Sequence, residues 1–183
     1  MWIVAGLGNP GRRYSKTRHN VGFMIADVIA DEFGIELKKR ESCMVGAGSI
    51  EDDEVVLMKP LTFMNRGGFA VKDLMEQYHV PHERLIVLHD DIDMETGKLK
   101  IRRRGSSGGH KGIESILHSI GTGDFVRVKI GIGREEGIPV EDYVLSKFRR
   151  DEIPVIHEAI RKASEAVVAI ISDGVDKAMN SFN

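Results

Sequence analysis

Three histidines lie in polar segments of the sequence, where an imidazole could transfer a proton: His19, His89 and His110. Asp90 directly follows the second of them. An unperturbed imidazole titrates near neutral pH, and an aspartate beside it fixes its tautomer and stabilises the imidazolium that forms. We predict no nucleophile elbow, the sharp strand-to-helix turn that presents a catalytic serine, and the single cysteine, Cys43, lies in a predicted hairpin strand away from these residues. The pattern therefore favours activation of water over a covalent nucleophile.

A group of carboxylates, Asp90, Asp91 and Asp93, comes directly after the apolar segment 85–88. At the end of a strand, such carboxylates serve as metal ligands, as partners that orient a base, or as turn formers. A metal site needs several ligands, and three close carboxylates supply part of such a set. The residues alone leave these three interpretations open.

The glycine-rich segment 6–11, Gly-Leu-Gly-Asn-Pro-Gly, has the spacing of the dinucleotide-binding fingerprint. That fingerprint requires a helix that begins within the glycines, so that a pyrophosphate sits on the helix N-terminus. Residues 12–20 carry no helical apolar stripe, and Pro10 removes one backbone N–H group. The acidic residues near the expected distance, Asp27 and Asp31, lie in a helical stretch and not at a strand end. We therefore reject a nucleotide-binding oxidoreductase.

Two further polar loops precede predicted helices. The first, 62–68, contains Asn65, which is also a candidate helix N-cap. The second, 108–112, contains His110 and Lys111, and its backbone N–H groups together with the lysine could hold an anion. This second loop is not a P-loop, because His110 occupies the place of the second glycine.

Basic residues are clustered in two segments of this chain. The formal net charge is −2 at pH 7, which by itself indicates neither a nucleic acid nor a membrane as partner. Two basic groups stand out, although such groups are usually solvated faces. They are Arg12, Arg13, Lys16 and Arg18, and then Lys98, Lys100, Arg102, Arg103, Arg104 and Lys111.

Strands and helices alternate along the chain, which predicts an α/β fold with one sheet and helices on both faces. Apolar runs and period-two alternation predict strands at 2–5, 43–50, 54–58, 85–88, 98–102 and 126–132, of which the last two present a basic outer face. Helical spacing predicts helices at 21–33, 71–78 and 113–120, and a long C-terminal helix at 156–170 that Gly174 ends.

The length of 183 residues favours one domain, 1–183, with a core large enough to need no disulfide or metal. A single cysteine and the lack of a signal peptide indicate the reducing cytoplasm. No apolar run approaches the roughly 20 residues that span a bilayer, so we expect no membrane partner.

Taken together, these segments resemble the bacterial peptidyl-tRNA hydrolase family. The resemblance runs through 6–11, Tyr14, 18–20, 59–65, 89–93, 108–112, 129–133 and 144–148. It implies hydrolysis of the ester that joins a peptide to the 3′ end of tRNA, with the acceptor arm and 3′ end of peptidyl-tRNA as the partner. It also implies a monomeric three-layer α/β/α globule with a mixed central sheet and a long C-terminal helix, and neither cofactor nor metal.

The functional residues of the family carry over position by position. His19 would be the general base that activates water, and Asp90 would hold and polarise it. The resemblance places substrate-binding groups at Asn9, Tyr14, Met64, Asn65, His110 and Lys111, and a tRNA phosphate clamp at Arg102 and Lys129. At Lys111 the chain departs from the family, because many members have asparagine there and lysine lacks the amide's acceptor. Contact with a phosphate or with the ribose edge is the alternative role for this side chain.

Besides the oxidoreductase rejected above, one alternative accompanies this interpretation. A tRNA 3′-end binding module without activity would retain the basic face but lack the base and its partner, whereas both are present here. Segment 134–148, with Gly137 and Pro139, has the composition of a mobile lid over the cleft. The amphipathic C-terminal helix favours packing on the sheet over an extended contact with tRNA.

Overall fold

Seven strands form one mixed sheet in the order β2-β3-β4-β1-β5-β7-β6 in a computed structural model that describes residues 1–183. The strands are β1 (Trp2–Gly6), β2 (Lys38–Arg40), β3 (Cys43–Ile50), β4 (Asp53–Pro60), β5 (Leu85–Asp91), β6 (Leu99–Arg102) and β7 (Val126–Gly131). The four interior strands β4, β1, β5 and β7 run parallel to one another. Antiparallel pairing adds β3 and β2 at one side and β6 at the other.

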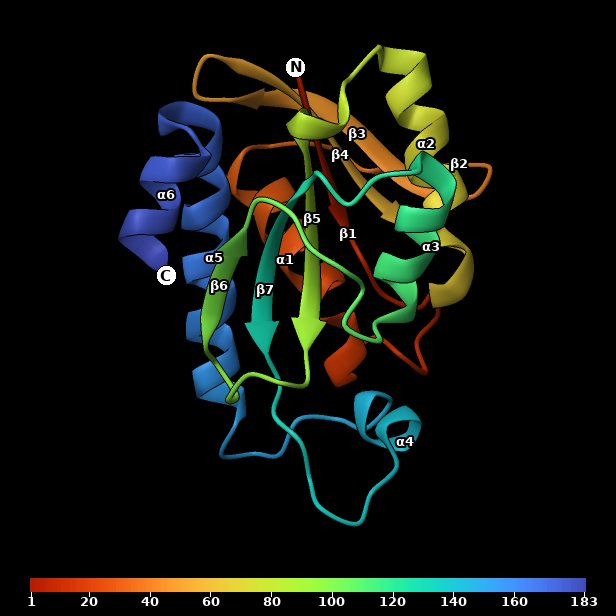
Figure 1. The fold of residues 1–183 in the computed structure, drawn as a ribbon, viewed down its shortest axis with the longest axis vertical. Helices are drawn as coiled ribbons and strands as arrows, with labels where there is room; N and C mark the ends of the chain where they lie inside the picture. The colour runs from red at the N-terminus through yellow and green to blue at the C-terminus, as the bar shows by residue number, and fades with distance from the viewer.

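Helices cover both faces of this sheet, as Figure 1 shows. They are α1 (Val21–Glu32), α2 (Gly67–Tyr78), α3 (Lys111–Ile120), α4 (Val140–Val144), α5 (Ile153–Asp173) and α6 (Val175–Phe182), with the short 3₁₀ turns η1 (Arg18–Asn20), η2 (Met64–Arg66) and η3 (His82–Arg84). One buried cluster joins the sheet to α1, α5 and α6, and a second joins it to α2 and α3. No helix combines the length and the apolar character needed to cross a membrane.

Strand β1 shows how the sequence builds two cores. Val4 points into the cluster under α1 and α5, whereas its neighbours Ile3 and Ala5 point into the cluster under α2 and α3. Successive side chains of a strand face opposite sides, so a strand covered on both faces is apolar without interruption. The same pattern in β5 fixes the end of that strand, and with it Asp90, between the two cores.

The predicted α/β class, the mixed sheet and the long C-terminal helix are confirmed. Three short elements were not predicted: β2, α4 and α6. Gly174 does end α5, but with a φ of 94° it also turns the chain directly into α6. Eight residues are too few for the apolar period to stand out from the sequence, and α6 is held by packing against α5 and β6.

The basic outer face predicted for 126–132 is wrong at Arg127. This side chain is 2% exposed, because β7 lies between β5 and β6 and is covered on both faces. Its guanidinium donates to the backbone carbonyls of Gly105, Ser106 and Gly123. Burial without a carboxylate partner lowers the pKa of Arg127, which serves to hold the loop before α3.

Candidate active site

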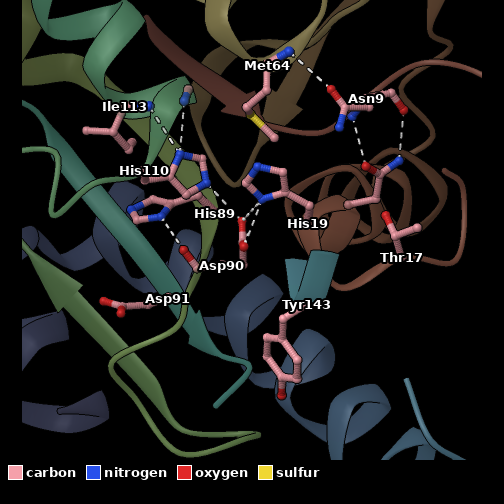
Figure 2. Close-up of polar contacts among 12 residues, drawn as sticks. Asn9, Thr17, His19, Met64, His89, Asp90, Asp91, His110, Ile113 and Tyr143 are labelled. Carbon is pink, nitrogen blue, oxygen red and sulfur yellow. Dashed lines mark hydrogen bonds and ion pairs between the residues drawn. The ribbon is translucent and has the colours of Figure 1, made fainter. Parts of the chain in front are cut away.

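The carboxyl ends of the four parallel strands meet at one edge of the sheet, where open α/β sheets build their sites. Segments that follow β1, β4 and β5 converge there with the N-terminus of α3, and a cleft of about 730 Å³ lies between them. Its lining includes Asn9, His19, Met64, Asp90 and His110. Figure 2 shows these five side chains turned toward one another, although 101 positions of sequence separate the first from the last.

The loop between β1 and α1 is closed by two asparagines. The backbone N–H of Asn9 donates to Oδ1 of Asn20 at 2.8 Å, and Nδ2 of Asn20 donates to the Asn9 carbonyl at 2.9 Å. Asn20 is 2% exposed, so water does not compete for these bonds. The pair fixes both ends of the loop, and therefore the positions of Asn9 and His19 relative to each other.

The Asn9 side chain has a defined orientation. Its Oδ1 accepts a hydrogen bond from the backbone N–H of Met64 at 3.1 Å (Figure 2). An acceptor at that position must be the amide oxygen, so the NH₂ group takes the other side. No group of the protein bonds to this NH₂, and Asn9 lines the cleft. The cleft is thereby provided with one free amide donor.

His19 is held by Asp90. Its Nδ1 lies 3.0 and 2.9 Å from the two carboxylate oxygens of Asp90. Asp90 is 2% exposed and, as a carboxylate, only accepts, so Nδ1 of His19 carries a proton and donates. In a neutral ring this leaves Nε2 with a free lone pair, and that lone pair can accept a proton from water.

A second histidine donates to the same carboxylate. Nε2 of His110 lies 2.9 Å from Oδ1 of Asp90. Its Nδ1 accepts from the backbone N–H groups of Gly112 and Ile113, so His110 is the N-cap of α3. Because Nδ1 is an acceptor, the ring proton must be on Nε2, facing Asp90. The N-terminus of α3 thus sets the tautomer of His110, and the rings of His19 and His110 lie with centroids 4.9 Å apart.

The two histidines determine the charge state of Asp90. Burial alone would raise the pKa of this carboxyl group. The charge and the hydrogen bonds of His19 and His110 outweigh burial and lower the pKa far below the usual range. Asp90 is therefore held as a carboxylate between the two histidines.

His89 was predicted to lie in a polar loop, and this is wrong. It lies within β5, is 4% exposed and packs edge-on against His110 at a centroid distance of 4.9 Å. Its Nδ1 donates to the carbonyl of Asp90, and its Nε2 has no partner in the protein. Burial, together with the nearby His110, holds the pKa of His89 well below the usual range, so this ring is neutral and packs beneath the site.

The three groups of this centre also have the composition of a metal site. His19, Asp90 and His110 offer ligand atoms within 4.8 Å of one another. A neutral imidazole that binds a metal through Nε2 carries its proton on Nδ1. In His110 that Nδ1 accepts two backbone N–H groups and cannot carry a proton as well. The geometry of His19, Asp90 and His110 therefore fits a carboxylate that accepts two N–H hydrogen bonds better than it fits a set of metal ligands.

Basic side chains line the side of the cleft formed by β6, β7 and the loop before α3. Arg102, Arg104 and Lys111 line it and form no ion pair with any carboxylate of the chain. Lys129 also lines it, but its Nζ lies 3.2 Å from Asp91. The structure thus leaves three cations free to meet an anionic partner.

Comparison with known proteins assigns this arrangement to a family. The family model described as peptidyl-tRNA hydrolase matches residues 3–183. The chain belongs to the peptidyl-tRNA hydrolase family. Proteins named peptidyl-tRNA hydrolase from Thermodesulfovibrio yellowstonii and Bacillus subtilis are 47% and 46% identical to it, over 100% of this chain and 99% and 98% of theirs. A crystal structure of peptidyl-tRNA hydrolase from Acinetobacter baumannii matches with a TM-score of 0.95 at 35% identity, over 100% of this chain and 94% of that one.

Two residues that the family resemblance assigned to the substrate do not line the cleft. Asn65 is exposed in η2, and it does not cap α2, whose N-cap is Arg66 without a side-chain hydrogen bond. Tyr14 is half-buried beside Arg13, and its carbonyl accepts from the hydroxyl of Thr17. Their roles in this member of the family stay predictions that depend on contact with a bound substrate.

Sequence reasoning missed a second buried polar cluster next to the site. Arg18, directly before His19, is 2% exposed and forms an ion pair with Glu152 at 2.8 Å. Arginine in a polar loop normally points to solvent, and its partner lies 134 positions away, so no local pattern marks the pair.

Proposed function

We propose that this chain hydrolyses the ester bond between a peptide and the 3′-terminal ribose of tRNA, and that His19 is its general base. The observation that carries the proposal is the free Nε2 of His19 at the cleft, with Nδ1–H held by the buried carboxylate of Asp90. Membership of the peptidyl-tRNA hydrolase family supports the substrate class.

The reaction needs only water. His19 accepts a proton from a water molecule as the oxygen attacks the ester carbonyl, and Asp90 stabilises the imidazolium. The tetrahedral intermediate then expels the 3′ oxygen of the ribose, which takes the proton back from His19. An ester has a better leaving group than an amide, so these reaction steps need no covalent intermediate and no cofactor.

Asn9 is placed to bind the reacting carbonyl. Its NH₂ group is free, while its oxygen is fixed by the N–H of Met64. A rigid donor aimed at the developing oxyanion lowers the barrier because it requires no reorganisation during the reaction. Met64 is 8% exposed and forms an apolar wall beside this donor. We assign both residues to the peptide end of the substrate.

We assign the tRNA backbone to the basic rim. Phosphate contacts are independent of sequence, as an enzyme acting on many tRNAs requires. Arg102 is exposed and unpaired, so it is the stronger member of the proposed clamp, and Lys129 would have to share its charge with Asp91. Lys111 is exposed at the N-terminus of α3, where a phosphate or the ribose edge can reach it.

His110 takes a role different from simple contact with substrate. Its hydrogen bond to Asp90 makes it the second donor that keeps that carboxylate ionised and oriented. Tyr14 and Asn65 we keep as contacts that form only when the 3′ end of tRNA is bound. We further propose that the enzyme acts as a monomer, in the cytoplasm where peptidyl-tRNA arises.

The test is incubation with an N-blocked aminoacyl-tRNA, with free aminoacyl-tRNA as the matched substrate. We expect release of the blocked amino acid and little release of the free one. His19→Ala should remove nearly all turnover, while its circular dichroism spectrum and its binding of tRNA stay unchanged. Tight binding of tRNA by the wild type without any release would instead identify a binding module and overturn the enzymatic proposal.

A further inference from the structure

The side chain of Arg18 is buried beside the proposed base. Its guanidinium lies over the rings of Tyr143 and Phe148, at 4.4 and 5.2 Å from their centroids. Its Nη1 donates to Oε2 of Glu152 at 2.8 Å, and its Nε donates to the hydroxyl of Ser146 at 3.1 Å. One side chain thus reaches four residues of the segment that follows β7.

Glu152 collects bonds from three separate parts of the chain. Its Oε2 accepts from Arg18 and, at 3.4 Å, from the hydroxyl of Thr96 in the turn after β5. Its Oε1 accepts from the backbone N–H of Arg149 at 2.8 Å. The carboxylate therefore ties the loop after β1, the turn after β5 and the start of α5 to one point.

Asn20 anchors one end of the turn η1, which carries His19, through its two bonds to Asn9, and the other end is held differently. Its N-cap, Thr17, makes no side-chain cap hydrogen bond, and three residues are too short for a stable turn by themselves. Its backbone is held from outside, because the N–H of Arg18 donates to the carbonyl of Ser146 at 2.9 Å and Thr17 forms a bridge with Lys147. The Thr17–Arg18 end of the turn is thus held by the segment to which the Arg18 side chain is bonded.

We propose that Arg18 is a positioning residue: its ion pair with Glu152 orients η1 so that Nδ1 of the adjacent His19 meets Asp90. The inference rests on the proposed function of His19. A permanently charged, stacked guanidinium is well suited to this task, because its planar fork bonds in fixed directions. Arg18 itself does not line the cleft, so its effect on the reaction passes through His19.

The test uses Arg18→Lys, which keeps the charge but loses the planar fork, and Glu152→Gln, which keeps the shape but loses the charge. For each we expect kcat to fall by at least about tenfold, since small displacements of a catalytic group are costly, with KM changed less than about twofold. In an Asp90→Asn background the same changes should cost less than about twofold. A purely structural role predicts equal losses in both backgrounds.

A spectroscopic readout makes the test independent of turnover. The ¹⁵N shifts of the His19 ring report which nitrogen carries the proton, and we expect the Nδ1–H form in the wild type and a mixture of tautomers in both variants. Arg161→Met, which removes two exposed ion pairs on α5, should alter neither kcat nor these shifts. If wild-type kcat and a pure Nδ1–H tautomer persist in both variants, the inference fails while the proposed function stands. If the wild type releases nothing, the proposed function fails, and the ring shifts still decide the positioning role.

Discussion

Two adjacent residues of the turn η1 each bind a buried carboxylate, that of Asp90 and that of Glu152. His19 donates to Asp90, and Arg18 donates to Glu152. The two carboxylates are 2% and 5% exposed, and each accepts from elements that are distant in sequence. For both, burial would raise the pKa, and the bonded partners lower it below the usual range.

The partners differ in what they can do. Arg18 carries a permanent charge, so its pair with Glu152 is complete before any substrate arrives. In the proposed reaction the imidazole of His19 accepts a proton from water, so that Asp90 gains a full ion pair with it in the transition state. An interaction that strengthens in the transition state accelerates a reaction, whereas one already complete fixes geometry. In the roles proposed above, the buried carboxylate of Asp90 serves the reaction, and the buried carboxylate of Glu152 fixes the position of η1.

The strongest way to break this comparison is Asp90→Asn. The amide can no longer stabilise an imidazolium, and it can reverse the tautomer of His19. We expect kcat to fall by about 10² to 10⁴ with KM nearly unchanged. Steady-state hydrolysis of N-blocked aminoacyl-tRNA measures this, and His89→Gln is the control, since His89 packs beneath the site without a bond to the carboxylate of Asp90. Retention of even a tenth of wild-type kcat would contradict the role of Asp90.

In the Arg18–Glu152 pair, Glu152→Gln should lower the stability of the folded protein. Breaking a buried ion pair by removing one partner should lower the free energy of unfolding by about 3 kcal/mol at pH 7. The lowered pKa of Glu152 means that its contribution is complete above the ordinary carboxyl range and is lost as the pH falls through the pKa of the folded state.

The difference between wild type and Glu152→Gln should therefore shrink as the pH falls below the ordinary range of a glutamate carboxyl group. Both proteins should retain the acid sensitivity due to Asp90, whose pKa is lowered as well. Urea unfolding at pH 7, 5 and 3 measures the difference. A difference that stays constant across this range would show that folding does not lower the pKa of Glu152.

A smaller effect is expected from His110, the second histidine that donates to Asp90. His110→Ala leaves Asp90 with one donor in place of two and removes the cap of α3. We expect kcat to fall by about 10- to 150-fold, since a hydrogen bond to a charged group contributes about 1.5–3 kcal/mol. Loss of the cap should also lower the free energy of unfolding by about 1 kcal/mol. An increase in KM alone, at constant kcat, would instead favour direct contact between His110 and the substrate.

The smallest effect concerns exposed charges, where the two cations of the proposed clamp differ. Arg102→Ala should raise KM about three- to fivefold and reduce the salt dependence of kcat/KM. Lys129→Ala should do less, because Lys129 already neutralises Asp91 at 3.2 Å. Measurement of kcat/KM from low to physiological salt separates them. A larger effect for Lys129 would show that substrate displaces Asp91 from this pair.

The sequence was sufficient for those parts of the site that local patterns encode. Strand ends and polar loops are visible in composition, and parallel strands carry the segments that follow them to one edge of the sheet. This accounts for the proximity of Asn9, His19 and Asp90 after β1 and within β5, whereas His110 follows the antiparallel strand β6 and reaches the edge through a loop. Their family roles came from the resemblance and stay predictions.

What could not be predicted depends on distant partners. Arg18 and Arg127 occupy segments whose local patterns predict exposure, yet both are 2% exposed because groups far along the chain satisfy them. The polar side chain of His89 ends the apolar run and so predicts a loop, whereas strand β5 continues to Asp91. The hydrogen-bonding state of His110 depends on two backbone N–H groups, which no pattern of side chains reveals.

The reciprocal bonds between Asn9 and Asn20 have a consequence for how the loop between them can vary. They close a ring of chain whose interior, residues 10–16, is mostly exposed. We expect substitutions at exposed positions of this ring such as Arg12 and Ser15 to leave both asparagines in register. The proposed substrate contact Tyr14 lies within the same ring, so insertions there should be placed away from it.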